Sequence, residues 1–106
     1  MDEDVVLRYV EFSAAEARNQ TMDFLTKKVE EWYELNKGEI FETIRDKAKE
    51  GEFLVKLTTE WDTPDQAKVA ESFLIQELSV GLGYLMHYDH VKDKEYALIL
   101  DWSGQA

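Results

Sequence analysis

The sequence contains no cysteine and a single proline in 106 residues. Without cysteine the chain has no disulfide framework, no thiolate metal site and no thiol nucleophile, and a reducing compartment is its natural environment. The opening Met1-Asp2-Glu3-Asp4 is acidic where a secretory signal needs basic residues, and no apolar run approaches the length of a membrane span. We therefore expect a cytoplasmic protein.

Basic residues are also scarce. The chain has 12 of them against 23 acidic residues, a formal net charge of -11. A nucleic-acid-binding protein needs a basic footprint that displaces condensed counterions, so the phosphate backbone should repel this chain. Anionic membranes are disfavoured as partners for the same reason. The acidity favours a protein partner with a basic surface, and solubility alone is the alternative explanation for it.

The acidic excess is unevenly distributed. Residues 13–50 carry nine acids and seven bases, a net charge of -2, whereas the rest of the chain carries 14 acids and five bases, a net charge of -9. We expect the negative field to come from that remainder. Seven acids spread over its second helix and hairpin form the candidate acidic surface: Asp62, Asp65, Glu71, Glu77, Asp89, Asp93 and Asp101.

Length and composition predict one domain over residues 1–106, because 44% hydrophobic residues suffice for a single core. A first strand is expected over Val5–Phe12, which is rich in β-branched and aromatic residues. Ser13 and Glu16 then form a capping box, and an apolar stripe with a period of 3.6 residues continues to Ala48. Gly51 is placed to end this long helix.

The long helix poses a problem of size. About 36 residues span about 54 Å, whereas a compact domain of this length is roughly 30 Å across. Either the helix bends between Asn36 and Gly38, or a second subunit covers the overhanging stripe, which includes Trp32. From the second alternative we expect a homodimer, or a higher even oligomer, held partly by this helix.

The second half of the chain predicts a strand, a helix and a hairpin. Alternating residues over Phe53–Trp61 indicate a strand buried on one face. A shorter helix is expected to begin at Thr63-Pro64-Asp65-Gln66 and to end at Gly81 and Gly83. Two further strands, Tyr84–His90 and Glu95–Trp102, should be joined by a turn at residues 91–94.

The expected order is therefore (β)-α-β-α-β-β. It gives an α/β fold of the α+β type, with a three- or four-stranded sheet and one long and one shorter helix packed on one face.

This organisation resembles the small uncharacterised accessory proteins of phage and prophage genomes. The resemblance is carried by four segments: Ser13-Ala14-Ala15-Glu16-Ala17-Arg18, Ala48-Lys49-Glu50-Gly51, Leu82-Gly83-Tyr84 and Ile99-Leu100-Asp101-Trp102. It covers most of the chain loosely and carries over no catalytic residue. By analogy, the resemblance implies a non-enzymatic accessory protein.

One group of side chains is a candidate for chemistry. His87, Asp89, His90, Asp93 and Asp101 are the only place where both histidines and several carboxylates gather. His87 and Asp89 should share a strand face, as metal ligands or an acid/base pair would, while His90 should point to the other face. A small metal-dependent enzyme using His87, Asp89 and Asp93 is therefore the alternative function.

Other motifs have simpler structural explanations. Glu60 and Asp62 flank Trp61, an arrangement typical of paired carboxylates in sugar chemistry. The favoured explanation is that Asp62 helps to cap the next helix and that Glu60 faces water. Gly81-Leu82-Gly83 lacks the third glycine of a dinucleotide loop. We expect no cofactor, no metal and no catalytic residue.

Aromatic residues offer candidate interface positions. Trp32 and Tyr33 are adjacent on a helix and cannot both face the core fully, and Trp102 lies beside the chain end. Trp and Tyr are frequent anchors of interfaces, so we expect at least one of the three to contact a partner. The leading hypothesis is a non-enzymatic acidic protein that binds or inhibits a host protein through its surface, with a purely structural oligomer component as a further alternative.

Overall fold

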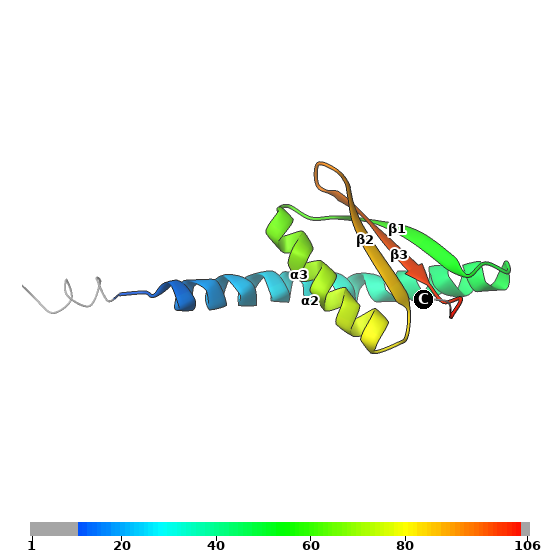
Figure 1. The fold of residues 1–106 in the computed structure, drawn as a ribbon, viewed down its shortest axis with the longest axis horizontal. Helices are drawn as coiled ribbons and strands as arrows, with labels where there is room; N and C mark the ends of the chain where they lie inside the picture. The colour runs from blue at the N-terminus through cyan, green and yellow to red at the C-terminus, as the bar shows by residue number, and fades with distance from the viewer. Residues whose placement is uncertain (1–10, 105–106) are drawn as a thin grey trace, which may run out of the picture.

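The computed structural model describes residues 11–104, which form two α-helices, a π-helix and a three-stranded antiparallel sheet (Figure 1). In chain order these are α2 (Ala14–Lys49), β1 (Leu54–Glu60), α3 (Pro64–Leu74), η1 (Ile75–Val80), β2 (Leu85–Lys92) and β3 (Glu95–Asp101). The expected α+β class is confirmed. Of the expected first strand, residues 5–10 lie outside the described residues, and Glu11 and Phe12 belong to no strand, so a fourth strand is not confirmed.

Helix α2 begins and ends where its capping residues predict. The backbone N–H of Glu16 donates to the Ser13 hydroxyl oxygen at 3.1 Å, and that hydroxyl lies 3.2 Å from the Glu16 carboxylate. At the other end the chain leaves the helix through Gly51, whose φ of 84° suits a residue without a Cβ. The helix is therefore one continuous element of 36 residues.

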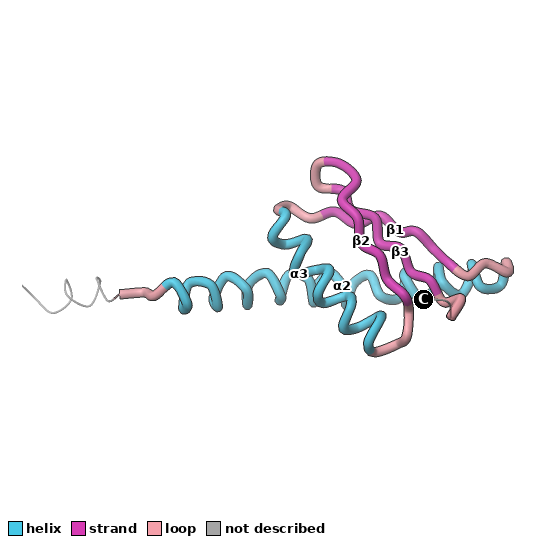
Figure 2. Tube along the Cα trace, viewed as in Figure 1, coloured by secondary structure: helices cyan, strands magenta, loops and turns pink. Residues whose placement is uncertain are grey.

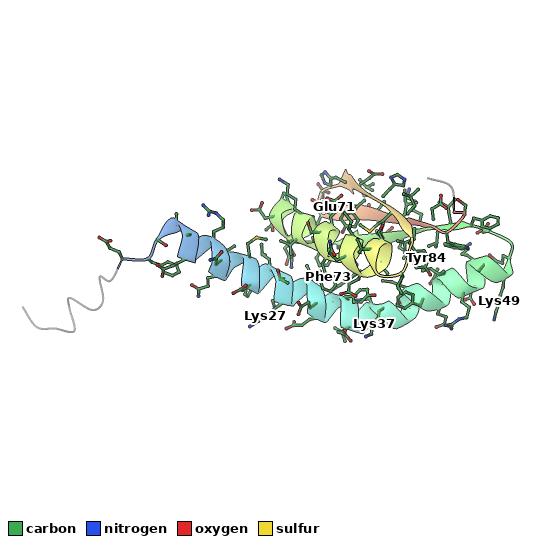
Figure 3. All side chains as sticks on the ribbon, turned by 60° about the horizontal axis from the view of Figure 1, so that its bottom comes forward. Lys27, Lys37, Lys49, Glu71, Phe73 and Tyr84 are labelled. Atoms are coloured by element: carbon green, nitrogen blue, oxygen red, sulfur yellow. The ribbon has the colours of Figure 1, made fainter. Side chains whose placement is uncertain are left out.

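The N-terminal half of α2 projects beyond the rest of the molecule (Figure 2). The radius of gyration is 19.0 Å, compared with about 13 Å for a compact domain of 100 residues. Helix α2 is also bowed, with Lys37 on the convex side and α3 and the sheet on the concave side (Figure 3). A bend between Asn36 and Gly38 was one of two alternatives, and Lys37 lies on the convex side of the bow, but the bow leaves the residues before Val29 projecting beyond α3 and the sheet.

Helix α3 begins at its predicted cap, where the backbone N–H of Gln66 donates to the Thr63 hydroxyl at 3.1 Å. The helical segment ends at Gly81 as expected, but after Leu74 the chain winds as the π-helix η1, which the sequence did not predict. The wider winding is visible in the bond from Gly81 N–H to the Gln76 carbonyl, five residues back, at 2.9 Å. A Cβ at Gly81 would lie 2.7 Å from the Glu77 carbonyl oxygen, so this close approach requires glycine.

The sheet has the order β1-β3-β2, and both pairings are antiparallel. Asp101 lies opposite Leu54 on one side and opposite Leu85 on the other. Strand β2 extends to Lys92 with a bulge after His90, so the hairpin turn is shorter than expected and consists of Asp93 and Lys94. Asp93 has a φ of 43°, a left-handed conformation that aspartate tolerates better than most residues.

The core consists of two adjoining clusters between the helices and one face of the sheet. The first cluster joins Tyr33, Ile40 and Ile44 of α2 to Leu74, Leu78 and the inward residues of β1 and β3. The second surrounds Val29, which is 0% exposed. Its other members come mainly from α3 and the residues before it, and are Trp61, Ala67, Val69, Ala70 and Tyr96.

Gly38 offers a direct test of the bowed helix. No atom lies within 4 Å of the position that a Cβ would take there. We expect Gly38→Ala to raise the free energy of unfolding by about 1 kcal/mol, because alanine loses less backbone entropy in a helix. Urea denaturation followed by circular dichroism measures the change, and a destabilised variant would show that the helix needs glycine to bend.

Candidate functional site

The histidine and aspartate cluster is divided between two faces of the sheet. His87 and Asp89 share the outward face of β2 as expected, and Asp101 lies on that face of β3. His90 lies on the other face, where its ring stacks on Tyr96 with centroids 4.8 Å apart and its Nε2 is 2.8 Å from the Asp93 carbonyl oxygen. Over residues 11–104 the structure contains no group of three His, Asp or Glu side chains arranged to hold a metal ion.

Asp101 has a local structural partner. Its carboxylate accepts a hydrogen bond from the backbone N–H of Ser103 at 2.8 Å. Hydrogen bonding from Ser103 lowers the pKa of Asp101, and the positive charge that His87 can carry lowers it further. Asp101 therefore orders the turn that follows β3, and His87 is near enough to influence it electrostatically.

Glu60 and Asp62 do not form a paired-carboxylate site. Glu60 is exposed on the outward face of β1, whereas Asp62 lies 3.7 Å from the ammonium of Lys94 across the loop. The backbone N–H of Asp62 also donates to the Gln66 side chain at 3.1 Å, so this segment helps to start α3. Trp61 between them is buried in the core.

A buried polar network lies where Trp61 meets the sheet. The Tyr88 hydroxyl is 2.7 Å from the Thr59 hydroxyl and accepts a hydrogen bond from the Trp61 indole N–H. Thr59 in turn donates to the Tyr96 carbonyl at 3.2 Å. Burial raises the pKa of Tyr88, and the bonds from Thr59 and Trp61 oppose that rise. No pattern in the sequence indicates this network, because it depends on the register of three strands.

The candidate interface aromatics contribute to the core. Tyr33 is buried and packs edge-on against Phe73, with centroids 5.5 Å apart. Trp32 is partly buried and packs edge-on against Trp61, with ring centroids 5.1 Å apart. Trp102 is partly buried against Tyr84, edge-on at 6.2 Å. That one of Trp32, Tyr33 and Trp102 contacts a partner stays a prediction.

The seven candidate acids are spread over several parts of the surface. Glu77 lies near Tyr33 of α2, where its charge adds to burial in raising the pKa of that phenol. Asp65 faces a groove beside α3, and Glu71 lines a recess with Tyr88 and His90. Asp62 and Asp93 lie near the hairpin end, so that Asp89 and Asp101 are the two that share the outward face of the sheet.

The outward face of the sheet is the first candidate binding surface, and we call it the outer face. Its residues alternate with the buried ones along each strand, and no described helix covers it. From β1 to β3 to β2 it contains Leu54, Lys56, Thr58, Glu60, Glu95, Ala97, Ile99, Asp101, Leu85, His87, Asp89 and Lys92.

Two glutamates lie at one end of the outer face, and the exposed leucines lie around Asp101 at the other end. Glu60 and Glu95 are paired at one end, with Asp89 on the adjoining row. Leu54 and Leu85 flank Asp101 at the other end and are 51% and 38% exposed. Glu60 and Glu95 were not predicted as members of this surface, although strand alternation together with the correct pairing places them there.

The second candidate surface is a groove of about 720 Å³ between the projecting half of α2 and α3. Its walls include Met22 and Leu25 from α2, and Val69 and Phe73 from α3. Figure 3 shows Phe73 between the two helices. The length of the apolar stripe predicted that α2 extends beyond the core, but the groove itself depends on where α3 crosses α2.

Comparison with protein-family models, curated proteins and solved structures finds no match to this chain. Among the described residues, no helix combines the length and the apolar character needed to cross a bilayer.

Replacing Tyr88 tests whether its network stabilises the fold. We expect Tyr88→Phe to lower the free energy of unfolding by about 1–3 kcal/mol, because the Trp61 indole N–H loses its acceptor in a partly buried site. Thr59→Val and the double variant complete a mutant cycle. Strictly additive losses in urea denaturation would show that the two hydroxyls are not coupled.

The raised pKa of Tyr88 predicts that the folded protein loses stability at alkaline pH. The folded protein keeps this phenol protonated at pH values where the unfolded chain, with an ordinary pKa near 10, has begun to release the proton. Stability should therefore fall as the pH rises above about 10 and through the folded pKa. Urea midpoints across that range should fall less in Tyr88→Phe than in the parent, and equal falls would contradict this assignment.

Proposed function

We propose that this chain is a non-enzymatic protein that binds a basic protein surface through its outer face and acts by covering that surface. The main observation behind this proposal is a sheet face that no described helix covers. It contains four carboxylates and two lysines, namely Glu60, Asp89, Glu95, Asp101, Lys56 and Lys92. The chain around it is strongly acidic, at a net charge of -11. Complementary potentials of this kind raise the rate of encounter with a positively charged partner.

The apolar end of the outer face supports the same proposal. Leu54 and Leu85 are exposed there, and Ile99 lies on the adjoining row between Lys56 and His87. A protein interface commonly joins an apolar contact area to a charged rim. A partner with an apolar side chain beside two or three basic groups fits this arrangement, with its basic groups over Glu60, Asp89 and Glu95.

The proposed mechanism is steric. A basic surface that normally holds nucleic acid would be occupied by the outer face, because the carboxylates compete with the phosphates for the same lysine and arginine side chains. The resemblance to phage and prophage accessory proteins is the basis for proposing a host protein as that partner. Asp93 lies in the hairpin turn and forms no group with His87 and Asp89 that could hold a metal ion, which favours this proposal over a metal-dependent enzyme using those three residues.

Charge neutralisation tests the outer face. We expect the combined variant Glu60→Gln, Asp89→Asn and Glu95→Gln to lose the association that the parent shows with its basic partner. The matched control removes the same charges from the solvent side of α2 through Asp23→Asn, Glu30→Gln and Glu42→Gln, all three of which are exposed. Parallel capture from a host lysate, followed by mass spectrometry, should identify proteins retained by the parent and the control but lost with the outer-face variant.

Association kinetics of a captured protein then decide the mechanism. Steering between exposed charges is screened over about 8 Å at physiological ionic strength, so the association rate should fall as salt rises while the dissociation rate changes little. Any residual association of the outer-face variant, measured at high protein concentration, should depend less steeply on salt than that of the α2 control. Equal retention by the two variants, or an association rate that is insensitive to salt, would contradict the proposal.

A further inference from the structure

The groove between α2 and α3 is an apolar surface that the proposed function does not use. Its walls are α2 residues from Ala17 to Thr26 and α3 residues from Asp65 to Phe73, followed by Gln76 of η1. Met22 is 46% exposed at its centre. The groove ends before Val29, which is fully buried in the core where α3 packs across α2.

We propose that this groove is the interface between two copies of the chain, related by a two-fold axis. In this arrangement the projecting half of α2 from each copy lies antiparallel in the groove of the other. The interface is distinct from the outer face, so the dimer neither requires nor excludes the proposed partner.

The length of the projecting segment fits the groove. Residues 14–28 span about 22 Å of helix and end where Val29 becomes buried beneath α3. When two such segments lie antiparallel about an axis near residues 21 and 22, the N-terminal end of each reaches Val29 of the other. Each projecting segment is then enclosed by the α2 and α3 helices of its partner copy.

Sterics select the antiparallel direction. If the two α2 segments ran parallel, each α3 would cross its own α2 beside Val29, at the same height along the helix pair. The two α3 helices would then occupy the same space. In an antiparallel pair the two α3 helices lie at opposite ends of the contact. The antiparallel arrangement also opposes the two helix dipoles.

Charge favours a second copy over a basic partner at this site. Two copies with a net charge of -11 each repel one another, so they can associate only through a surface that lacks the acidic excess. The groove is such a surface, because its charged residues are Arg18 and Lys68 against one acid, Asp65. The same two bases would repel a basic protein.

The contact area is sufficient for a weak but specific dimer. A helix about 11 Å wide, half enclosed over about 22 Å, buries roughly 380 Å² per copy and roughly 760 Å² on the two copies. The α3 walls of the two grooves add to this area, so the total lies near the lower limit for specific interfaces. We therefore expect a dissociation constant on the order of 10 µM.

Sedimentation of the full chain with two matched variants tests the proposal. Met22→Glu places a charge in the groove, whereas Phe24→Glu places the same charge on the opposite side of the same helix, at a residue that is 61% exposed. We expect the parent and Phe24→Glu to sediment as dimers at about 100 µM, and Met22→Glu to dimerise about 100-fold more weakly. Circular dichroism at low concentration establishes that all three are folded.

Two kinds of sedimentation result would overturn the proposed dimer. A parent chain that is monomeric at about 100 µM would assign the groove to another occupant. A dimer that survives Met22→Glu, or one that Phe24→Glu alone disrupts, would place the interface elsewhere.

A single introduced cysteine tests the antiparallel register, since the chain has no cysteine of its own. Met22→Cys should form a disulfide-linked dimer under mild oxidation, because residues near the two-fold axis of an antiparallel helix pair approach their own copies. Phe24→Cys is the matched control and should remain largely uncrosslinked. Equal crosslinking of both variants, or crosslinking of Phe24→Cys alone, would contradict this geometry.

Discussion

The packing of α3 across the middle of α2 determines the arrangement of the whole molecule. Its centre is Val29, whose side chain is fully enclosed by Trp61 and the small and branched residues Ala67, Val69 and Ala70. Small residues let the two helices approach closely. The crossing leaves one half of α2 beside the sheet, while the other half projects past α3 and forms a groove with it. The core, the groove and the elongated shape all follow from this one contact.

Local signals predicted most element boundaries. Ser13 and Thr63 both cap helices through the bonds expected of them, and alternation in Leu54–Glu60 identified the inward residues of β1. The π-helical turn was missed because it depends on the close approach of the Glu77 carbonyl to Gly81, and no periodic pattern reports such an approach. Local patterns therefore defined where elements begin, but less well how the backbone winds inside them.

The candidate surfaces were harder to predict, since each depends on contacts between distant segments. The uneven charge was evident from counting residues, but strand register decides which acids share a face. Asp89 is joined there by Glu95 and Glu60, whereas Glu77 lies beside Tyr33 on another side. In the same way Trp32 looked available for an interface, yet its ring packs against Trp61. Met22, about two turns away from Val29, lines an open groove instead.

The projecting half of α2 has a consequence for local stability. A helix of about 15 residues is marginal in water when it stands alone, because nucleation is costly and each added residue contributes little. Here the packed half of α2 supplies the nucleus, so the projecting half extends from it but can unwind from its free end without disturbing the core. Its amide protons should exchange with solvent much faster than those between Val29 and Ile44, and any molecule lying in the groove would slow that exchange.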